Sequence, residues 1–190
     1  MTVGGLVLFP GAWTDRDQST LRAIEQAVHP LPTFRFDFPY RRAGRKIPDR
    51  APMLMQCVVD EVRAVANELG CSTADLVIGG RSMGGRMCTM AVADEHDPLP
   101  VRGVICIAYP LHPPKKPNQL RVEHLPHINV PTLFVSGTRD EFGTPDELTR
   151  ELAAMPLPPT IEFIDGGRHE LKGDDDRVAD LVRQWLLMLQ

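Results

Sequence analysis

The sequence lacks long hydrophobic runs and lacks any excess of positive charge. No apolar stretch approaches the roughly 20 residues that a helix needs to cross a bilayer, so a membrane-spanning protein is not expected. Lysine and arginine number 21 against 25 aspartates and glutamates, which leaves no general electrostatic footprint for nucleic acid or an anionic membrane. We therefore expect neither as a partner. Because residues 1–6 carry no basic signal-peptide region, we expect a cytoplasmic location.

Signatures of metal, redox and nucleotide sites are also missing. The four cysteines form no CxxC pair and lie among apolar neighbours, so we interpret them as reduced and largely buried: Cys57, Cys71, Cys88 and Cys106. The pair His124 and His127 has a proline between its members and no carboxylate-rich set to complete a metal site. Neither GxGxxG nor a Walker GK[ST] loop is present. We expect no metal and no cofactor.

Length and composition indicate one globular α/β domain over residues 1–190, with no repeat and no linker. The chain is 43% hydrophobic and 24% charged, the usual balance for a globular protein. Short apolar runs predict strands at residues 6–9, 34–38, 76–78, 104–108, 132–136 and 161–164. Helical stretches are predicted at residues 17–28, 54–69, 83–92, 145–155 and 176–189. This alternation predicts a three-layer, doubly wound, mostly parallel sheet of about six strands.

One long irregular insert, residues 109–130, is rich in proline and carries several basic side chains. In an open α/β sheet, sites form where loops leave the carboxyl ends of the strands. The insert is therefore placed to overhang such a site, and we interpret it as a candidate small lid.

The clearest chemical motif is GxSxG at residues 80–84, directly after a predicted strand and directly before a predicted helix. Small glycines let the backbone double back tightly and leave the Ser82 hydroxyl exposed at the helix N-terminus. There the helix dipole favours developing negative charge. The motif predicts a nucleophilic serine; the alternative is a helix N-cap serine in a glycine turn.

A serine nucleophile needs a base that is itself oriented by a carboxylate, in the chain order Ser, Asp, His. Asp140 follows the fifth predicted strand, and His169 follows the sixth in a glycine-rich loop. Both therefore lie at the same sheet edge as Ser82. The alternatives are a solvated loop role for His169 and, for Asp140, a role in capping the turn before the helix that begins at Pro145. The rivals of Asp140 are Glu141, Asp146 and Asp165.

Acyl transfer also needs donors for the oxyanion. We predict the backbone N–H of Met83, the residue after the nucleophile, and that of Ala12 in the loop after the first strand. Trp13, Arg81 and Arg86 are candidate substrate-binding residues, and the alternative for Trp13 is a core or pocket-wall aromatic. Arg81 and Arg86 flank the motif, and a basic run follows at residues 41–46. These cations are either solvated and ion-paired, or one or more of them receives an acidic acyl or leaving group.

Four stretches carry a resemblance to a known family: residues 38–40, 79–86, 109–114 and 137–143. On them the chain resembles small α/β-hydrolases of the dienelactone-hydrolase-like kind. More narrowly, it is similar to the hydrolase-like domain family shared by a testis-expressed protein and the third subunit of the nonspecific-lethal chromatin complex. The resemblance implies Ser82, Asp140 and His169 as a catalytic triad. Pro10 departs from the family pattern, in which His commonly precedes Gly-Ala.

Together these features predict a serine hydrolase that cleaves a small carboxylic ester or thioester through an acyl-enzyme. The alternative is an α/β-hydrolase fold that has lost catalysis and acts as a binding or scaffolding module, because a fold does not dictate a function. We expect a small-molecule ester substrate and either a monomer or a homodimer.

Overall fold

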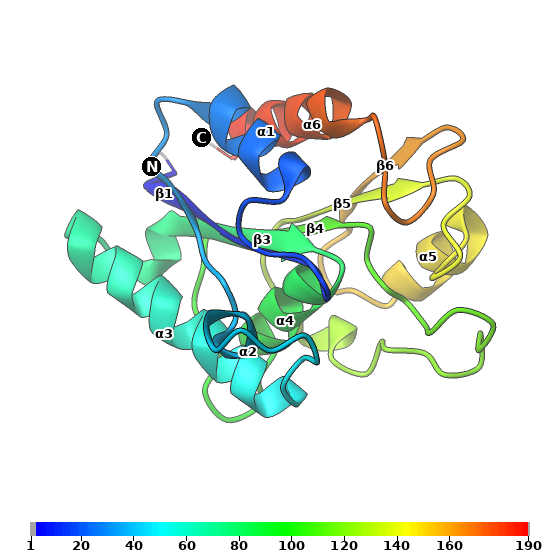
Figure 1. The fold of residues 1–190 in the computed structure, drawn as a ribbon, viewed down its shortest axis with the longest axis horizontal. Coiled ribbons are helices and arrows are strands. Elements are labelled where there is room, and N and C mark those ends of the chain that lie inside the picture. Colours follow the sequence, from blue (N-terminus) through cyan, green and yellow to red (C-terminus); the bar gives the residue numbers. More distant parts are fainter. Residues whose placement is uncertain (1–2, 190) are drawn as a thin grey trace.

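The computed structural model describes residues 3–189 and contains a six-stranded, all-parallel sheet (Figure 1). Met1, Thr2 and Gln190, the ends of the expected 1–190 domain, lie outside the described residues. The strand order is β2-β1-β3-β4-β5-β6. The strands are β1 (Gly5–Phe9), β2 (Thr33–Arg35), β3 (Leu76–Arg81), β4 (Gly103–Ile107), β5 (Thr132–Gly137) and β6 (Thr160–Ile164). The predicted doubly wound α/β class is confirmed.

Helices cover both faces of the sheet. They are α1 (Ser19–Val28), α2 (Pro39–Arg42), α3 (Ala51–Leu69), α4 (Met83–Val92), α5 (Pro145–Leu152) and α6 (Asp175–Met188), with 3-10 turns η1 (Thr73–Asp75) and η2 (Leu125–His127). Helices α1 and α6 pack together on one face, and α3 and α4 lie on the other (Figure 1). Among residues 3–189, every helix is too short or too polar to span a bilayer.

The core explains why the strands read as continuous apolar runs. All residues of β1, β3, β4 and β5 are buried, whereas the edge strands β2 and β6 are largely half-buried. Alternate strand residues enter two apolar clusters, one under α3 and α4 and one under α1 and α6. A strand covered on both faces needs apolar side chains at every position, because each side points into a core.

Several element boundaries differ from the sequence prediction. The second strand ends at Arg35 rather than residue 38, because Pro39 opens α2, a helical turn that the apolar pattern did not indicate. Helix α3 begins at Ala51, three residues early, with Pro52 in its first turn. Strand β3 continues through its two glycines to Arg81, three residues beyond the predicted end at residue 78.

The insert at residues 109–130 follows β4 and is anchored to the body of the protein. Leu111, Leu125 and Ile128 are buried in the core cluster beneath α3 and α4. The Tyr109 hydroxyl donates to the Arg121 carbonyl oxygen at 2.8 Å, which closes the base of the insert. Its most exposed part is residues 114–119.

Candidate active site

Ser82 lies between β3 and α4 in a strained backbone conformation. Its φ of 49° and ψ of −112° are unfavourable for a residue with a side chain. The Ser82 N–H donates to the Ile107 carbonyl oxygen at 2.7 Å, which ties the turn to the end of β4. Ser82 occupies the N-cap position of α4, as the alternative interpretation expected, but its side chain makes no capping hydrogen bond, so the hydroxyl is not used to cap the helix.

The glycines of the motif are needed because three backbones meet at this turn. A Cβ atom on Gly80 or on Gly84 would lie 2.2 Å from the carbonyl oxygen of Phe9, at the end of β1. No real Cβ atom tolerates that distance, so these positions exclude every side chain. The GxSxG spacing is therefore a steric requirement of the close packing between β1, β3 and α4.

Ser82, His169 and Asp140 form one hydrogen-bonded chain. The Ser82 hydroxyl lies 2.9 Å from His169 Nε2, and His169 Nδ1 lies 2.9 and 3.0 Å from the two carboxylate oxygens of Asp140. Asp140 and His169 are buried, whereas Ser82 is half-buried. With Nδ1–H donating to the carboxylate, Nε2 is left as the acceptor for the serine proton. The solvated interpretation of His169 is wrong.

Asp140 is the carboxylate that the structure brings to His169, and its rivals lie elsewhere. Glu141 is exposed, and Asp165 accepts a hydrogen bond from Thr138 Oγ1. Helix α5 itself is capped by the Thr144 side chain, whereas Asp140 caps the turn that precedes this helix and also contacts the imidazole. The Asp140 carboxylate accepts the Phe142 N–H at 2.8 Å, which orients it toward the imidazole.

Close packing of two loops brings Asp140 and His169 together. A Cβ on Gly137, at the end of β5, would lie 2.1 Å from the carbonyl oxygen of Gly167 in the loop after β6. The Phe142 ring stacks on the His169 imidazole, with ring centroids 3.9 Å apart. These contacts restrict the imidazole in a way that residue spacing alone does not reveal.

Arg81 forms a hydrogen bond with the backbone of the loop that carries His169. Its Nη2 donates to the His169 carbonyl oxygen at 2.7 Å. In the amide orientation that gives both ends of the Gln18 side chain a partner, its nitrogen donates to Thr14 Oγ1. Its oxygen accepts hydrogen bonds from Arg81 Nε at 3.0 Å and Arg81 Nη1 at 3.1 Å. Burial lowers the pKa of Arg81, and the nearby carboxylate of Glu170 raises it. Since all three guanidinium nitrogens are engaged by the protein, we no longer interpret Arg81 as a substrate ligand.

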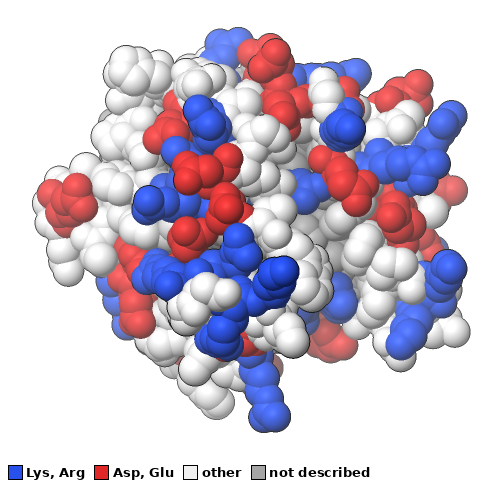
Figure 2. Space-filling view, viewed as in Figure 1, with Lys and Arg blue, Asp and Glu red and all other residues white. Residues whose placement is uncertain are grey.

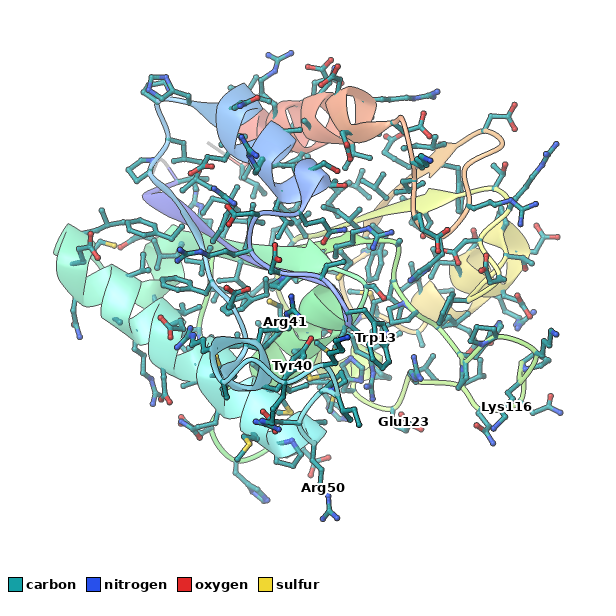
Figure 3. The ribbon with its side chains drawn as sticks, in the orientation of Figure 1. Trp13, Tyr40, Arg41, Arg50, Lys116 and Glu123 are labelled. Carbon is teal, nitrogen blue, oxygen red and sulfur yellow. The ribbon has the colours of Figure 1, made fainter. Side chains whose placement is uncertain are left out.

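A cavity of about 540 Å³ opens at Ser82. Its wall includes Ala12, Trp13, Met83 and Arg86 from the sequence prediction, and Arg121 from the insert, which the sequence analysis did not single out as a site residue. Trp13 is 68% exposed, so it is not a core aromatic. Figure 3 shows it at the loop tip beside Tyr40 and Arg41 of α2. Met83 is the first residue of α4, where the N–H has no intrahelical acceptor.

His124 and His127 of the insert differ in their surroundings. His124 Nε2 lies 2.9 Å from Thr89 Oγ1 on α4, and burial followed by the charge of Arg86 lowers the pKa of His124 to about 4. His127 is exposed. Across residues 3–189, no group of three or more His, Cys, Asp and Glu side chains is arranged to hold a metal ion.

Solved structures with the same fold cover nearly the whole chain. A serine hydrolase homologue from Coxiella burnetii is 14% identical, with a TM-score of 0.77 over 98% of this chain and 86% of that one. Est1E from Butyrivibrio proteoclasticus is 13% identical, with a TM-score of 0.77 over 99% of this chain and 88% of that one. Dienelactone hydrolase from Anabaena variabilis is 18% identical, with a TM-score of 0.74 over 97% and 86%. These TM-scores establish a common fold, and at such low sequence identity they establish the fold alone.

A family model extends the likeness to the sequence. The model described as an alpha/beta hydrolase domain matches residues 4–185, which include every strand and the three residues of the hydrogen-bonded chain. The narrower resemblance to the testis-expressed protein and the chromatin-complex subunit stays a prediction. The chain belongs to the alpha/beta hydrolase domain family.

Proposed function

We propose that the protein is a serine hydrolase that cleaves a small carboxylic ester or thioester. The observation that carries the proposal is the continuous hydrogen-bonded chain from Ser82 through His169 to Asp140. A serine hydroxyl is a weak nucleophile near neutral pH, and a base within hydrogen-bond reach activates it. The similarity of the fold to a serine hydrolase homologue and a dienelactone hydrolase supports the same chemistry.

In the proposed mechanism, Ser82 Oγ attacks the carbonyl carbon while His169 Nε2 accepts the hydroxyl proton. Asp140 keeps the proton of the neutral imidazole on Nδ1 and stabilises the imidazolium that forms. His169 then donates its proton to the leaving alcohol or thiol, which leaves the acyl group on Ser82. A water molecule next attacks the acyl carbon while His169 accepts a proton from it, and return of that proton to Ser82 Oγ releases the acid.

We propose the backbone N–H groups of Met83 and Ala12 as the oxyanion donors. Both residues line the cavity beside Ser82, and Met83 opens α4, where an unpaired N–H and the helix dipole favour negative charge. Ala12 follows β1 and Met83 follows β3, and the pairing of these two parallel strands brings both residues to the same edge of the sheet.

The cavity supports small substrates. About 540 Å³ is in the range of small-molecule sites and leaves little room for an extended polypeptide. As a lid we propose the exposed tip of the insert, residues 114–119, because the remainder is anchored through Leu111, Leu125 and Ile128.

The test is covalent labelling with a small neutral fluorophosphonate, read by intact mass. The wild-type protein should gain one adduct and the Ser82→Ala variant none, with both showing the same circular dichroism spectrum. An unlabelled, folded wild-type protein would contradict the proposal and favour a binding or scaffolding module.

A further inference from the structure

The cavity at Ser82 is lined by three arginines and two carboxylates, and each carboxylate acts on an arginine other than Arg86 and Arg121. Asp49 receives two hydrogen bonds from Arg45, at 2.7 and 3.1 Å. Glu170 is exposed and acts electrostatically on Arg81, the arginine whose three nitrogens already have partners. The positive charge that remains in the cavity comes from Arg86 and Arg121.

Within residues 3–189, neither Arg86 nor Arg121 forms an ion pair with a carboxylate. Arg86 Nε is buried and has no hydrogen-bond partner, and Arg121 makes one side-chain hydrogen bond, from Nη1 to the Pro110 carbonyl oxygen at 3.3 Å. Burial and then the charge of Arg86 lower the pKa of Arg121, so the two guanidinium groups repel one another.

Both arginines are held in place beside the nucleophile. Arg86 lies one helical turn after Ser82, and its N–H donates to the Ser82 carbonyl oxygen at 3.1 Å. The backbone of Arg121 is fixed by the Tyr109 hydroxyl at its carbonyl oxygen and by the Leu111 carbonyl oxygen at its N–H. Two half-buried cations without a counter-charge are unfavourable, and an anion between them would remove that cost.

The cations outside the cavity are accounted for differently. Arg41, Arg42 and Arg45 of the basic run pair with Asp15, Glu61 and Asp49, as the ion-paired interpretation expected. Figure 2 shows Lys and Arg side chains gathered over α2 and the start of α3. Arg50 and Lys116 extend outward at the margin of the molecule, away from Trp13 (Figure 3).

We propose that Arg86 and Arg121 bind a carboxylate group carried by the ester substrate, so that the enzyme prefers acidic esters over neutral ones. A guanidinium group presents donors in a planar fork that matches a carboxylate, and charge-assisted hydrogen bonds of this kind are the strong ones. The inference rests on the proposed function of Ser82. The bond from Ser82 Oγ to the acyl carbon forms as the bond to the alcohol oxygen breaks, and His169 carries the proton between the two oxygens.

Two matched ester pairs test the inference and locate the carboxylate. In the acyl arm, the mono-4-nitrophenyl ester of adipic acid is compared with its adipamic acid analogue, in which a carboxamide replaces the carboxylate. In the leaving-group arm, 4-acetoxybenzoate is compared with 4-acetoxybenzamide. We expect kcat/KM to be at least about tenfold higher for the carboxylate in one arm, mainly through KM, and that arm identifies which side of the ester the arginines bind.

Arginine variants separate recognition from chemistry. Arg86→Gln and Arg121→Gln should each reduce the carboxylate preference severalfold, and Arg121→Lys should retain part of it. Arg22→Gln removes one exposed arginine of α1 and should leave the preference unchanged. Labelling by the neutral fluorophosphonate shows that each variant is folded with an active Ser82.

The outcomes are distinguishable. If Ser82 is not labelled in the wild-type protein, the proposed function fails and the inference fails with it. If Ser82 is labelled but the wild-type protein shows no carboxylate preference in either arm, or hydrolyses none of the four esters, the inference alone is overturned. A preference that survives in both glutamine variants overturns it as well.

Discussion

Arg81 Nη2 donates a hydrogen bond to the carbonyl oxygen of His169 at 2.7 Å, across 88 residues of sequence. Arg81 is the last residue of β3 and immediately precedes Ser82, so one side chain connects the Ser82 turn to the loop that carries His169. Gln18, just before α1, holds the other two nitrogens. The alignment of Ser82 with His169 therefore depends on a buried cation that lies outside the reacting groups.

The first prediction concerns this contact. Arg81→Gln leaves the His169 carbonyl and the Gln18 amide without their donor, at a cost of about 1–3 kcal/mol of folding free energy for each buried group. We expect kcat on an activated ester to fall at least about tenfold with a smaller change in KM, because the imidazole loses its alignment. Steady-state kinetics and urea unfolding, run on the same preparation, check this. Lower stability with an unchanged kcat would show that Arg81 only supports the fold.

The second prediction concerns the acid of the hydrogen-bonded chain. Asp140→Asn should reduce turnover by about 10⁴-fold with the fold intact, because an asparagine favours the wrong imidazole tautomer. Ser82→Ala and His169→Ala should abolish turnover. Glu141→Gln is the matched control, since Glu141 is the exposed neighbour of Asp140 and should be neutral. Equal losses in the Asp140 and Glu141 variants would contradict the assignment.

The third prediction concerns the tight turn at Ser82. Gly84→Ala should destabilise the protein by about 3 kcal/mol or more, because its Cβ would meet the Phe9 carbonyl oxygen at 2.2 Å. This runs against intrinsic preference, since alanine stabilises a helix by about 1 kcal/mol relative to glycine. Gly4→Ala is the control, because its Cβ would have 3.4 Å to its nearest neighbour. Chemical denaturation measures both, and an equally stable Gly84 variant would refute the steric explanation.

The fourth prediction concerns His124, which packs against Thr89. Its pKa is lowered from 6.5 to about 4 in the folded protein, so the unfolded chain binds the proton first as pH falls. This contribution to stability is complete above the unfolded value of 6.5 and is lost as pH falls toward 4. Between about pH 7 and pH 5 the loss amounts to at most about 2 kcal/mol.

The control for the pH effect is the variant His124→Gln, which cannot titrate. Urea unfolding of both proteins at the two pH values gives the difference due to His124, with the contribution of the carboxylates cancelled. We expect the variant to lose less stability on acidification than the wild type. Parallel pH profiles would mean that His124 is not held neutral by the fold.

Much of the fold was readable from local pattern. Four apolar runs predicted the buried central strands, and the parallel arrangement followed from the alternation with helices. The pattern failed where proline and glycine had positional roles. Pro39 opens α2 and Pro52 lies in the first turn of α3, and the glycines of β3 remain in the strand because β1 and β4 pack too close to admit side chains.

The positions of Ser82, Asp140 and His169 followed from motif and chain order, because residues that end parallel strands share one edge of the sheet. The hydrogen-bond partners of the arginines could not be predicted from motif or chain order. Arg81 and Arg86 both flank the motif and look equivalent in sequence. Arg81 is nevertheless buried with its three nitrogens hydrogen-bonded to the protein, whereas Arg86 is half-buried and its Nε has no hydrogen-bond partner. Arg121 reaches the cavity at Ser82 from an irregular insert. Periodicity reports which way a residue points within its own element, whereas pairing between distant segments depends on strand register and loop path, which exist only in the folded chain.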